Sequence, residues 1–188
     1  GSPYISACHL EGIENNVVLV DSVSKRYSEC GIRIGALITQ NKMVKENVMK
    51  WCQARLSPPL TGQIIAEASL DTSNEYMLEV YNDYVERRKF LIDGLNRIQG
   101  CYSPIPMGAF YTLAKLPVDD ADKFCAWCLE EFQYEGQTIM MAPASGFYTT
   151  PGLGKNEVRM AYVLKKEDLA KALVVLQKAL EAYPGRTL

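Results

Sequence analysis

The feature that most limits what this chain can fold into is a short apolar run at residues 16–21, Asn-Val-Val-Leu-Val-Asp. Its length and its β-branched residues are typical of a buried strand. A strand that is buried on both faces needs a neighbouring strand on each side. The residues before it contain a lead-in but no such neighbour. We therefore expect residues 1–75 to be a piece of a larger α/β domain.

One further strand and three helices are expected after this run. Residues 33–39 are expected to form the second strand. Helices are expected at residues 41–55, 61–70 and 73–98, and the longest of them carries one continuous apolar stripe. The first helix must end before Pro58, because proline disfavours helical geometry in the residue that precedes it. The expected N-terminal caps are Asn41, Thr61 and Ser73.

The second half of the chain alternates short strands with helices. Strands are expected at residues 109–113, 138–141 and 157–163. Helices are expected at residues 119–132 and 166–183. This mixture of short strands and helices predicts an α/β (α+β) fold.

The change in pattern places a domain boundary near residue 75. The long helix is expected to join residues 1–75 to residues 76–188. Neither region contains an internal repeat or a low-complexity segment. We therefore predict one incomplete domain followed by one small domain.

The composition is that of an ordinary soluble protein, with 48% apolar residues and a formal net charge of −2 over 188 residues. Basic residues are spread along the chain, which argues against binding of nucleic acid. The apolar runs are too short to span a membrane. The N-terminus lacks the charged and apolar regions of a secretion signal. A cytoplasmic location is therefore expected.

Six cysteines are scattered along the chain, unlike the dense framework of a small secreted domain. Cys125 and Cys128 form one CxxC pair within an expected amphipathic helix. His9 is the only histidine, so a zinc site has almost no ligands available, and no metal is predicted. The CxxC pair is expected to consist of buried or half-buried free thiols in a reducing compartment.

The segment at residues 22–35 holds the candidate chemistry. It follows the end of the first expected strand, where ligands of α/β sheets usually bind. Lys25 is flanked there by Ser22 and Ser24, and Arg33 is expected to open the next strand. Hydroxyls and a guanidinium suit a phosphate, and a desolvated lysine can attack a carbonyl. The alternatives are a solvated surface lysine or a P-loop, and the P-loop is excluded because its glycine-rich pattern is absent.

The SxSK pattern followed by GxRxG resembles the cofactor-lysine signature of the class I/II (fold type I) pyridoxal-phosphate-dependent aminotransferases. Eight residues separate the lysine from the arginine, as in that family. The resemblance extends over nearly the whole chain and includes aspartate-transaminase-like members. Further motifs of the family occur in its order at residues 57–62, 106–111, 141–147, 154 and 158–161.

The resemblance implies the C-terminal half of such an enzyme, a small C-terminal domain with a remnant of the large-domain sheet. It implies pyridoxal 5'-phosphate as cofactor and Lys25 as the Schiff-base lysine and acid/base of the proton transfer. Ser22, Ser24 and Arg33 would hold the cofactor phosphate. Arg159 would bind the substrate α-carboxylate with two hydrogen bonds, which orients the substrate for proton removal.

The implied full-length enzyme transfers an amino group between an amino acid and a 2-oxo acid. Aspartate or a related dicarboxylic acid is the first expectation for the substrate. A homodimer is implied, because active sites in the family lie at the subunit interface. Arg55 lies close to the place where some aspartate-specific members bind the side-chain carboxylate of the substrate. The alternative is an arginine at the end of a helix, where the helix dipole favours a positive charge.

The sequence departs from the family pattern at two positions. Glu29 stands where the signature prefers an apolar residue, and Ser57 replaces an asparagine before the proline pair. The family's ring-stacking aromatic, its asparagine and its aspartate to the pyridine nitrogen all precede this segment and would lie upstream of residue 1. The leading Gly1 and Ser2 fit either a tag remnant or native sequence.

Three alternatives to an active aminotransferase stay open. The polypeptide could be a catalytically inactive fragment, because much of the implied pocket is missing. It could belong to a cofactor-dependent lyase or synthase of the same fold that uses the same lysine and arginines. A binding module without enzymatic activity is the third, and it predicts that replacing Lys25 or Arg159 changes nothing.

Overall fold

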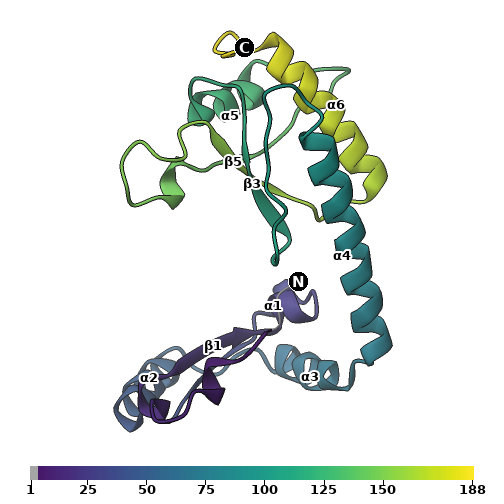
Figure 1. The fold of residues 1–188 in the computed structure, drawn as a ribbon. Coiled ribbons are helices and arrows are strands. Elements are labelled where there is room, and N and C mark those ends of the chain that lie inside the picture. The colour runs from purple at the N-terminus through teal and green to yellow at the C-terminus, as the bar shows by residue number, and fades with distance from the viewer. Residues whose placement is uncertain (1–3) are drawn as a thin grey trace. The chain divides into compact units, whose positions relative to one another are not determined.

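A computed structural model describes residues 4–188 and shows two compact units. The chain passes from the first unit to the second between Met77 and Leu78. In Figure 1 the first unit runs from purple to blue along the chain, and the second from teal to yellow. Gly1 and Ser2, whose origin the sequence leaves open, lie outside the described residues. Each unit has its own secondary structure and its own sheet.

The first unit is built on a two-stranded antiparallel sheet. Ser22 lies opposite Gly35 at one end of this sheet, and Val18 lies opposite Thr39 at the other. Single 3-10 turns lie at Ala7–His9 (η1), Glu14–Asn16 (η2), Cys30–Ile32 (η3) and Ser69–Asp71 (η4). The strands and helices are β1 (Val18–Ser22), α1 (Val23–Arg26), β2 (Gly35–Thr39), α2 (Lys42–Ala54) and α3 (Leu60–Ala68).

The prediction of a buried first strand is wrong in this structure. β1 begins at Val18 and pairs with β2 alone among the described strands, and Val20 is 75% exposed. The second strand begins at Gly35, so the expectation that Arg33 opens it is also wrong. Arg33 instead has a left-handed backbone with φ of 61°, which does not fit a strand.

Of the two N-terminal helix caps predicted at Asn41 and Thr61, the structure confirms the first and contradicts the second. Asn41 caps α2 as predicted, because its Oδ1 accepts a hydrogen bond of 3.1 Å from the backbone N–H of Val44. Thr61 is not a cap, since α3 already begins at Leu60, after Pro59. Proline is well suited to the start of a helix, where its missing N–H costs nothing.

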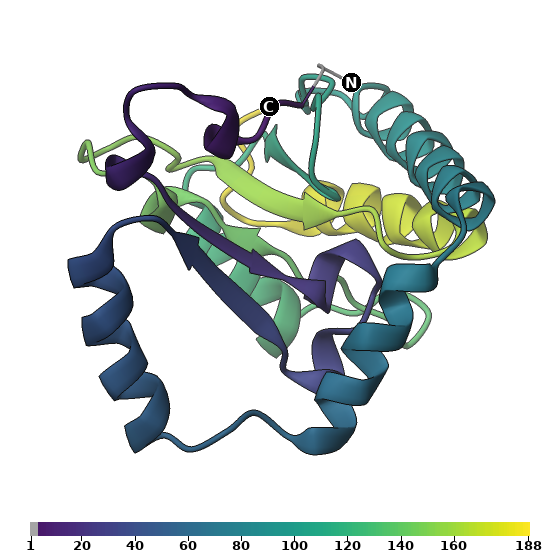
Figure 2. The same ribbon diagram turned by 90° about the horizontal axis from the view of Figure 1, so that it is seen from below.

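The second unit is built on a three-stranded antiparallel sheet in the order β3–β5–β4, with α4 and α6 beside each other (Figures 1 and 2). Arg159 on the central strand lies between Leu113 on β3 and Ala142 on β4. A short 3-10 turn, η5 (Ser145–Phe147), follows β4. The elements are α4 (Asn74–Leu95, which begins in the first unit), β3 (Tyr111–Lys115), α5 (Ala121–Glu130), β4 (Ala142–Pro143), β5 (Glu157–Ala161) and α6 (Lys166–Ala182).

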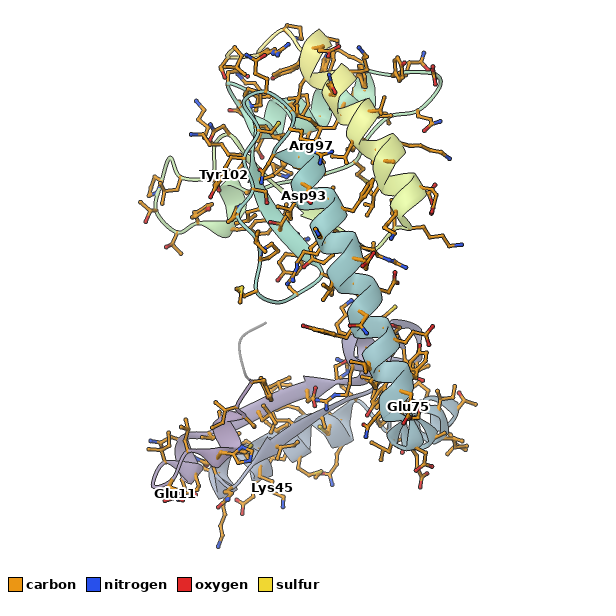
Figure 3. The ribbon with its side chains drawn as sticks, turned by 45° about the vertical axis from the view of Figure 1, so that its right-hand side comes forward. Glu11, Lys45, Glu75, Asp93, Arg97 and Tyr102 are labelled. Carbon is orange, nitrogen blue, oxygen red and sulfur yellow. The ribbon has the colours of Figure 1, made fainter. Side chains whose placement is uncertain are left out.

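A continuous apolar core stabilises the second unit. Leu95, Phe124 and Leu176, from three different helices, are each at most 1% exposed. α4 and α6 pack so closely that a Cβ added at Gly94 would lie 2.3 Å from a methyl carbon of Leu173. Asp93, next to it in sequence, is exposed and is labelled in Figure 3. The amphipathic pattern of these helices therefore produces the expected buried face.

Several boundaries in the second unit differ from the prediction, since β3 is shifted by two residues to Tyr111–Lys115 and β5 ends at Ala161. The expected strand at residues 138–141 is not formed, and the strand is Ala142–Pro143 instead. It pairs with β5 over those two residues, whereas the hydroxyl of Thr138 donates a hydrogen bond to the Cys128 carbonyl. α4 ends at Leu95 rather than near Ile98, whose N–H donates to the Leu95 carbonyl in a tighter turn.

The CxxC pair is buried, as predicted. Cys125 and Cys128 on α5 are free thiols that are 6% and 0% exposed. Burial raises the pKa of the Cys125 thiol to about 11 and that of the Cys128 thiol to about 12. A raised pKa leaves little thiolate at neutral pH, and the thiolate is the form that reacts. Among residues 4–188 no helix is long and apolar enough to cross a membrane.

Candidate active site

Lys25 lies in a single helical turn that begins directly at the end of β1. The last residue of the strand, Ser22, caps this turn because its Oγ accepts a hydrogen bond of 3.0 Å from the backbone N–H of Ser24. The turn is short, and Tyr27 ends it. An exposed lysine therefore lies just after the end of the strand, directly after the second of two serines.

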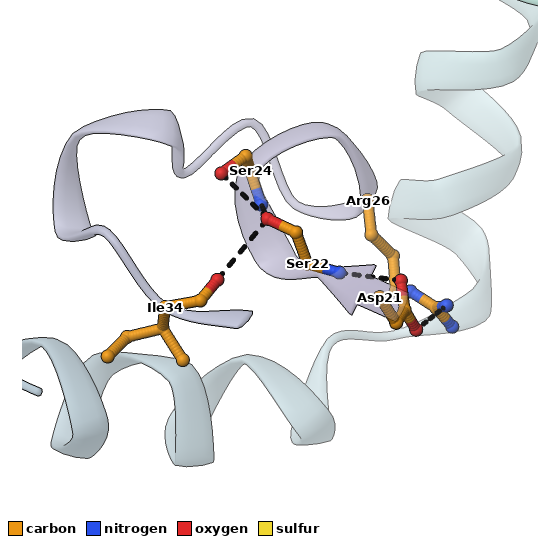
Figure 4. A network of polar contacts seen from close by, with 5 residues as sticks. All are labelled: Asp21, Ser22, Ser24, Arg26 and Ile34. Atoms are coloured by element: carbon orange, nitrogen blue, oxygen red, sulfur yellow. Dashed lines mark hydrogen bonds and ion pairs between the residues drawn. The ribbon is translucent and has the colours of Figure 1, made fainter. Parts of the chain in front are cut away.

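The two serine hydroxyls contact each other directly. Ser22 Oγ lies 2.8 Å from Ser24 Oγ and 3.2 Å from the carbonyl oxygen of Ile34 (Figure 4). The second contact fastens the end of β1 to the residue that follows Arg33. The two hydroxyls therefore lie together in the segment that leads to Lys25.

The acidic residue beside this pair already has a cationic partner. Asp21 Oδ2 forms an ion pair of 2.5 Å with Arg26, and its Oδ1 accepts a hydrogen bond of 2.8 Å from the backbone N–H of Ser22. Figure 4 shows this pair on the opposite side of Ser22 from Ser24. The Asp21 charge is therefore compensated locally, which reduces its repulsion of an anion at the hydroxyls.

Arg33 closes the loop that begins after Lys25. Its Nη1 donates a hydrogen bond of 2.8 Å to the carbonyl oxygen of Cys30. A guanidinium has five N–H groups, so this one contact leaves others of the exposed side chain available to an anion. Arg33 precedes Ile34, which the Ser22 hydroxyl holds, so the loop returns the arginine to the end of the strand where the serines lie.

The donor set of this segment fits a phosphate next to a carbonyl-binding amine. Ser22 and Ser24 offer short hydroxyl donors, Arg33 offers a planar set of N–H groups, and Lys25 offers a primary amine. All four side chains come from one stretch of chain that the Ser22–Ile34 contact closes. Such a set can bind a phosphate by hydrogen bonds and charge while the amine reacts.

Arg159 lies on the central strand of the sheet in the second unit, whereas the four residues above lie in the first unit. Its Cζ lies 4.9 Å from the ring centroid of Phe147 and 5.3 Å from that of Tyr111. No ion pair between Arg159 and a carboxylate occurs within residues 4–188. The rings attract the cation and hold it in place, while its N–H groups can still bind a carboxylate.

The loop that follows Phe147 has a fixed shape of its own. The hydroxyl of Tyr148 donates a hydrogen bond of 2.6 Å to Glu157 Oε2, and this bond raises the pKa of Tyr148. Gly154 has φ of +69°, and a Cβ there would lie 2.6 Å from the Tyr148 ring. Only glycine fits this position without strain, which explains the glycine in the sequence motif.

Sequence reasoning missed the two aromatic partners of Arg159. Tyr111 and Phe147 both lie in motifs that the sequence comparison used, but neither received a role. The signal was available, since an aromatic residue directly across or beside a strand arginine often stacks on it. Arg55 was considered as a substrate ligand, and it lies exposed at the C-terminal cap of α2.

Comparison with known proteins assigns this chain to a family. The family model "Aminotransferase class I and II" matches residues 2–176. An aspartate aminotransferase of Rhizobium meliloti is 28% identical over 187 residues, which cover 92% of this chain and 43% of the relative. An aspartate aminotransferase of Thermotoga maritima is 29% identical over 163 residues, covering 87% and 39%.

Solved structures share the fold. The crystal structure of the Rhizobium meliloti aspartate aminotransferase superposes with a TM-score of 0.78 at 26% identity, covering 95% of this chain and 46% of that one. An aromatic aminotransferase of Pyrococcus horikoshii gives a TM-score of 0.80 at 23% identity, which supports the fold alone. The chain spans less than half the length of the curated relatives that it matches. This chain belongs to the class I and II aminotransferase family.

Proposed function

We propose that this chain is the C-terminal part of a pyridoxal-phosphate-dependent aminotransferase, which transfers an amino group between an amino acid and a 2-oxo acid. Residues 1–75 would be the end of the large cofactor-binding domain, and residues 76–188 the small C-terminal domain. Membership of the family and the share of the relatives that the chain spans support this assignment. The observation that carries it is the serine pair beside Lys25.

Ser22, Ser24 and Arg33 are proposed to bind the phosphate of pyridoxal 5'-phosphate. The two hydroxyls lie 2.8 Å apart, close enough to share one phosphate group. The exposed guanidinium of Arg33 adds charge and further donors. With the phosphate held by these residues, Lys25, which follows Ser24 in the chain, would supply the amine for the cofactor.

Lys25 is proposed to bind the cofactor covalently through its Nζ and then to move the proton of the reaction. When bound, the cofactor supplies the electron sink that stabilises negative charge at the substrate carbon. With cofactor and substrate bound, Lys25 Nζ would take the proton from the substrate Cα and later give it back. This role requires a lysine at the end of a strand and beside the phosphate site, where the sequence has one.

Arg159 is proposed to bind the α-carboxylate of the substrate. A guanidinium matches a carboxylate with two parallel hydrogen bonds, which orient the bond that must break. The contacts with Phe147 and Tyr111 support this role, because they restrict the side chain before substrate arrives. Aspartate is the first candidate substrate, since the sequence relatives in several bacteria are named aspartate aminotransferases.

Other parts of the proposal rest on the family and the composition. The full-length enzyme is proposed to be a homodimer, as the family resemblance implies. A cytoplasmic location is supported by six cysteines that are all free. Since the chain carries only part of the implied pocket, the 188-residue polypeptide by itself is proposed to bind the cofactor but not to turn over.

The test is an absorbance titration of the chain with pyridoxal 5'-phosphate, followed by an assay for amino transfer. We expect a new visible band that is stable to dilution and that Lys25→Ala lacks. An unchanged band in Lys25→Ala would remove the proposed role of Lys25. In the full-length enzyme, turnover of aspartate should require a 2-oxo acid, whereas turnover without one would indicate a lyase.

A further inference from the structure

Glu29 forms a polar bridge between the candidate phosphate loop and Ser69, the residue that caps the C-terminal end of α3 and begins η4. It lies between Lys25 and Arg33, where the family signature prefers an apolar residue. Its Oε1 accepts a hydrogen bond of 2.7 Å from the hydroxyl of Ser69, which is 40 residues further along the chain and only 7% exposed. We call this contact the Glu29–Ser69 bridge.

A second contact fixes the same loop on the same helix. Gly62 on α3 is buried, and a Cβ there would lie 2.6 Å from the carbonyl oxygen of Ile32. The same Cβ would lie 3.3 Å from side-chain carbons of Ile34. The helix therefore touches the residues on both sides of Arg33, and only glycine allows this approach.

The loop between these contacts has an unfavourable backbone. Ser28 and Arg33 both have positive φ, 59° and 61°, although neither is a glycine. Such conformations persist only where surrounding contacts impose them. The Glu29–Ser69 bridge lies between the two strained residues, so it is placed to impose the conformation of Arg33.

The hydrogen bonding of the bridge is incomplete, which makes it an unfavourable contact if its role is stability alone. The Ser69 hydroxyl has one proton and two acceptors within reach, Glu29 Oε1 at 2.7 Å and the Ile65 carbonyl oxygen at 2.8 Å. Among the described residues, the buried Glu29 Oε2 has no hydrogen-bond partner. Burying an unsatisfied carboxylate oxygen is costly, and an apolar residue here would avoid that cost. Stability alone therefore does not account for a glutamate at this position.

We propose that Glu29 is a positioning residue that acts through Ser69. The bridge holds residues 28–33 against the C-terminal end of α3, and it thereby directs the Arg33 guanidinium toward a phosphate bound at Ser22 and Ser24. This inference rests on the proposed function, because it assigns Glu29 a role at the same phosphate site. It gives a role to a residue that departs from the family's signature.

The experiment measures how strongly a phosphate group promotes labelling of Lys25. The chain is treated with pyridoxal 5'-phosphate or with pyridoxal, which lacks the phosphate, and the adducts are fixed with borohydride. Peptide mass spectrometry gives the labelling of Lys25 relative to Lys45, an exposed lysine on α2 that serves as internal reference (Figure 3). The ratio of the two relative labellings is the phosphate preference.

We expect Glu29→Ala and Ser69→Ala each to lower the phosphate preference about tenfold, the usual effect of losing one charge-assisted hydrogen bond. The double variant should lose no more than either single variant, because both changes break one bridge. Glu29→Gln should retain most of the preference, since its Oε1 can still accept from Ser69. Glu46→Gln on α2, also exposed, is the matched control and should leave the preference unchanged.

A bridge that only stabilises the fold would lower the thermal midpoint and leave the phosphate preference intact, and this result would overturn the inference. Losses that add in the double variant would overturn it as well. If the unaltered chain shows no phosphate preference at Lys25, the proposed function fails together with the inference. A preference that persists in Glu29→Ala and Ser69→Ala would sink the inference alone.

Discussion

Residues 78–188 enclose a core of apolar side chains, whereas residues 4–77 bury almost nothing apolar. In the second unit, Leu95, Phe124 and Leu176 are at most 1% exposed. Among the described residues of the first unit, Gly62 and Ser69 are the buried ones, and Trp51 is 75% exposed. The candidate cofactor residues all lie in the unit without a core.

This difference means that the two halves of the candidate site are held in different ways. Arg159 lies on the central strand of a sheet whose other face, with Val158 and Met160, packs into a core, so its backbone is fixed by the fold. Lys25 and Arg33 lie on a loop that is fixed by hydrogen bonds of Ser22 and Glu29. Geometry that depends on a few polar contacts is easier to change by mutation than geometry that a packed core fixes.

The largest expected difference is in thiol reactivity. Three exposed cysteines, Cys8, Cys30 and Cys52, lie in the first unit, and three buried ones lie in the second. A thiol reagent at pH 8 should modify the first three at least about a thousandfold faster, because the buried thiols react only after local unfolding. Peptide mapping after short exposure measures the rates. Fast labelling of Cys128 would show that the second unit opens readily and would remove the contrast.

The three buried thiols give the stability of the second unit a pH dependence. Their folded pKa values are raised by burial, to about 12 for Cys128 and about 11 for Cys101, above the values of an exposed thiol. Their contribution is therefore fully present below about pH 9 and is lost as the pH rises toward 11 to 12. Urea unfolding followed at pH 8 and pH 10.5 should show a lower midpoint at the higher pH. A midpoint that rises instead would contradict the assignment.

A matched pair of leucine truncations compares the two units directly. Leu95→Ala should lower the free energy of unfolding by about 2–5 kcal/mol, because it leaves a cavity in the core. Leu60→Ala, at a position that is 72% exposed, should change it by less than about 0.5 kcal/mol. Urea unfolding measures both. Similar losses would indicate that Leu60 is buried in solution against a partner surface.

The sequence predicted the secondary structure of this chain better than its burial. The helices, the strands and the CxxC thiols follow from spacing that depends on near neighbours, and the cap at Asn41 follows from one side chain. Burial of the first strand was predicted from its composition, but composition only says that residues prefer to be covered. Val20 is 75% exposed, so composition alone did not decide its burial.

The contacts that fix the site were beyond sequence reasoning for a different reason. Ser22, Ser24 and Lys25 lie within four residues, so their proximity follows from local geometry. The Ser69 hydroxyl reaches Glu29 across 40 residues, and a separation of that length carries no local signal. The rings around Arg159 likewise come from two other elements of the chain.

Replacing Arg159 with lysine tests the proposed substrate contact. Lysine keeps the charge but loses the paired hydrogen bonds and the planar fit to the rings, so Arg159→Lys should weaken aspartate binding about tenfold. Nuclear magnetic resonance titration of the chain with aspartate measures the dissociation constant. Arg33→Lys, in the other unit, is the comparison and should leave aspartate binding unchanged. Equal weakening by both substitutions would mean that the effect is one of net charge.

Phe147→Leu is the mildest test of how the second unit holds Arg159. The Phe147 ring centroid lies 4.9 Å from Arg159 Cζ, and leucine keeps the apolar bulk while removing the ring's attraction for the cation. A cation–π contact at an exposed site is worth about 0.5–1 kcal/mol, so aspartate binding should weaken about two- to fivefold. The same titration detects a change of that size. In Arg159→Lys the Phe147→Leu substitution should add little, because the planar contact is already lost, and full additivity would mean that the ring acts on aspartate independently of Arg159.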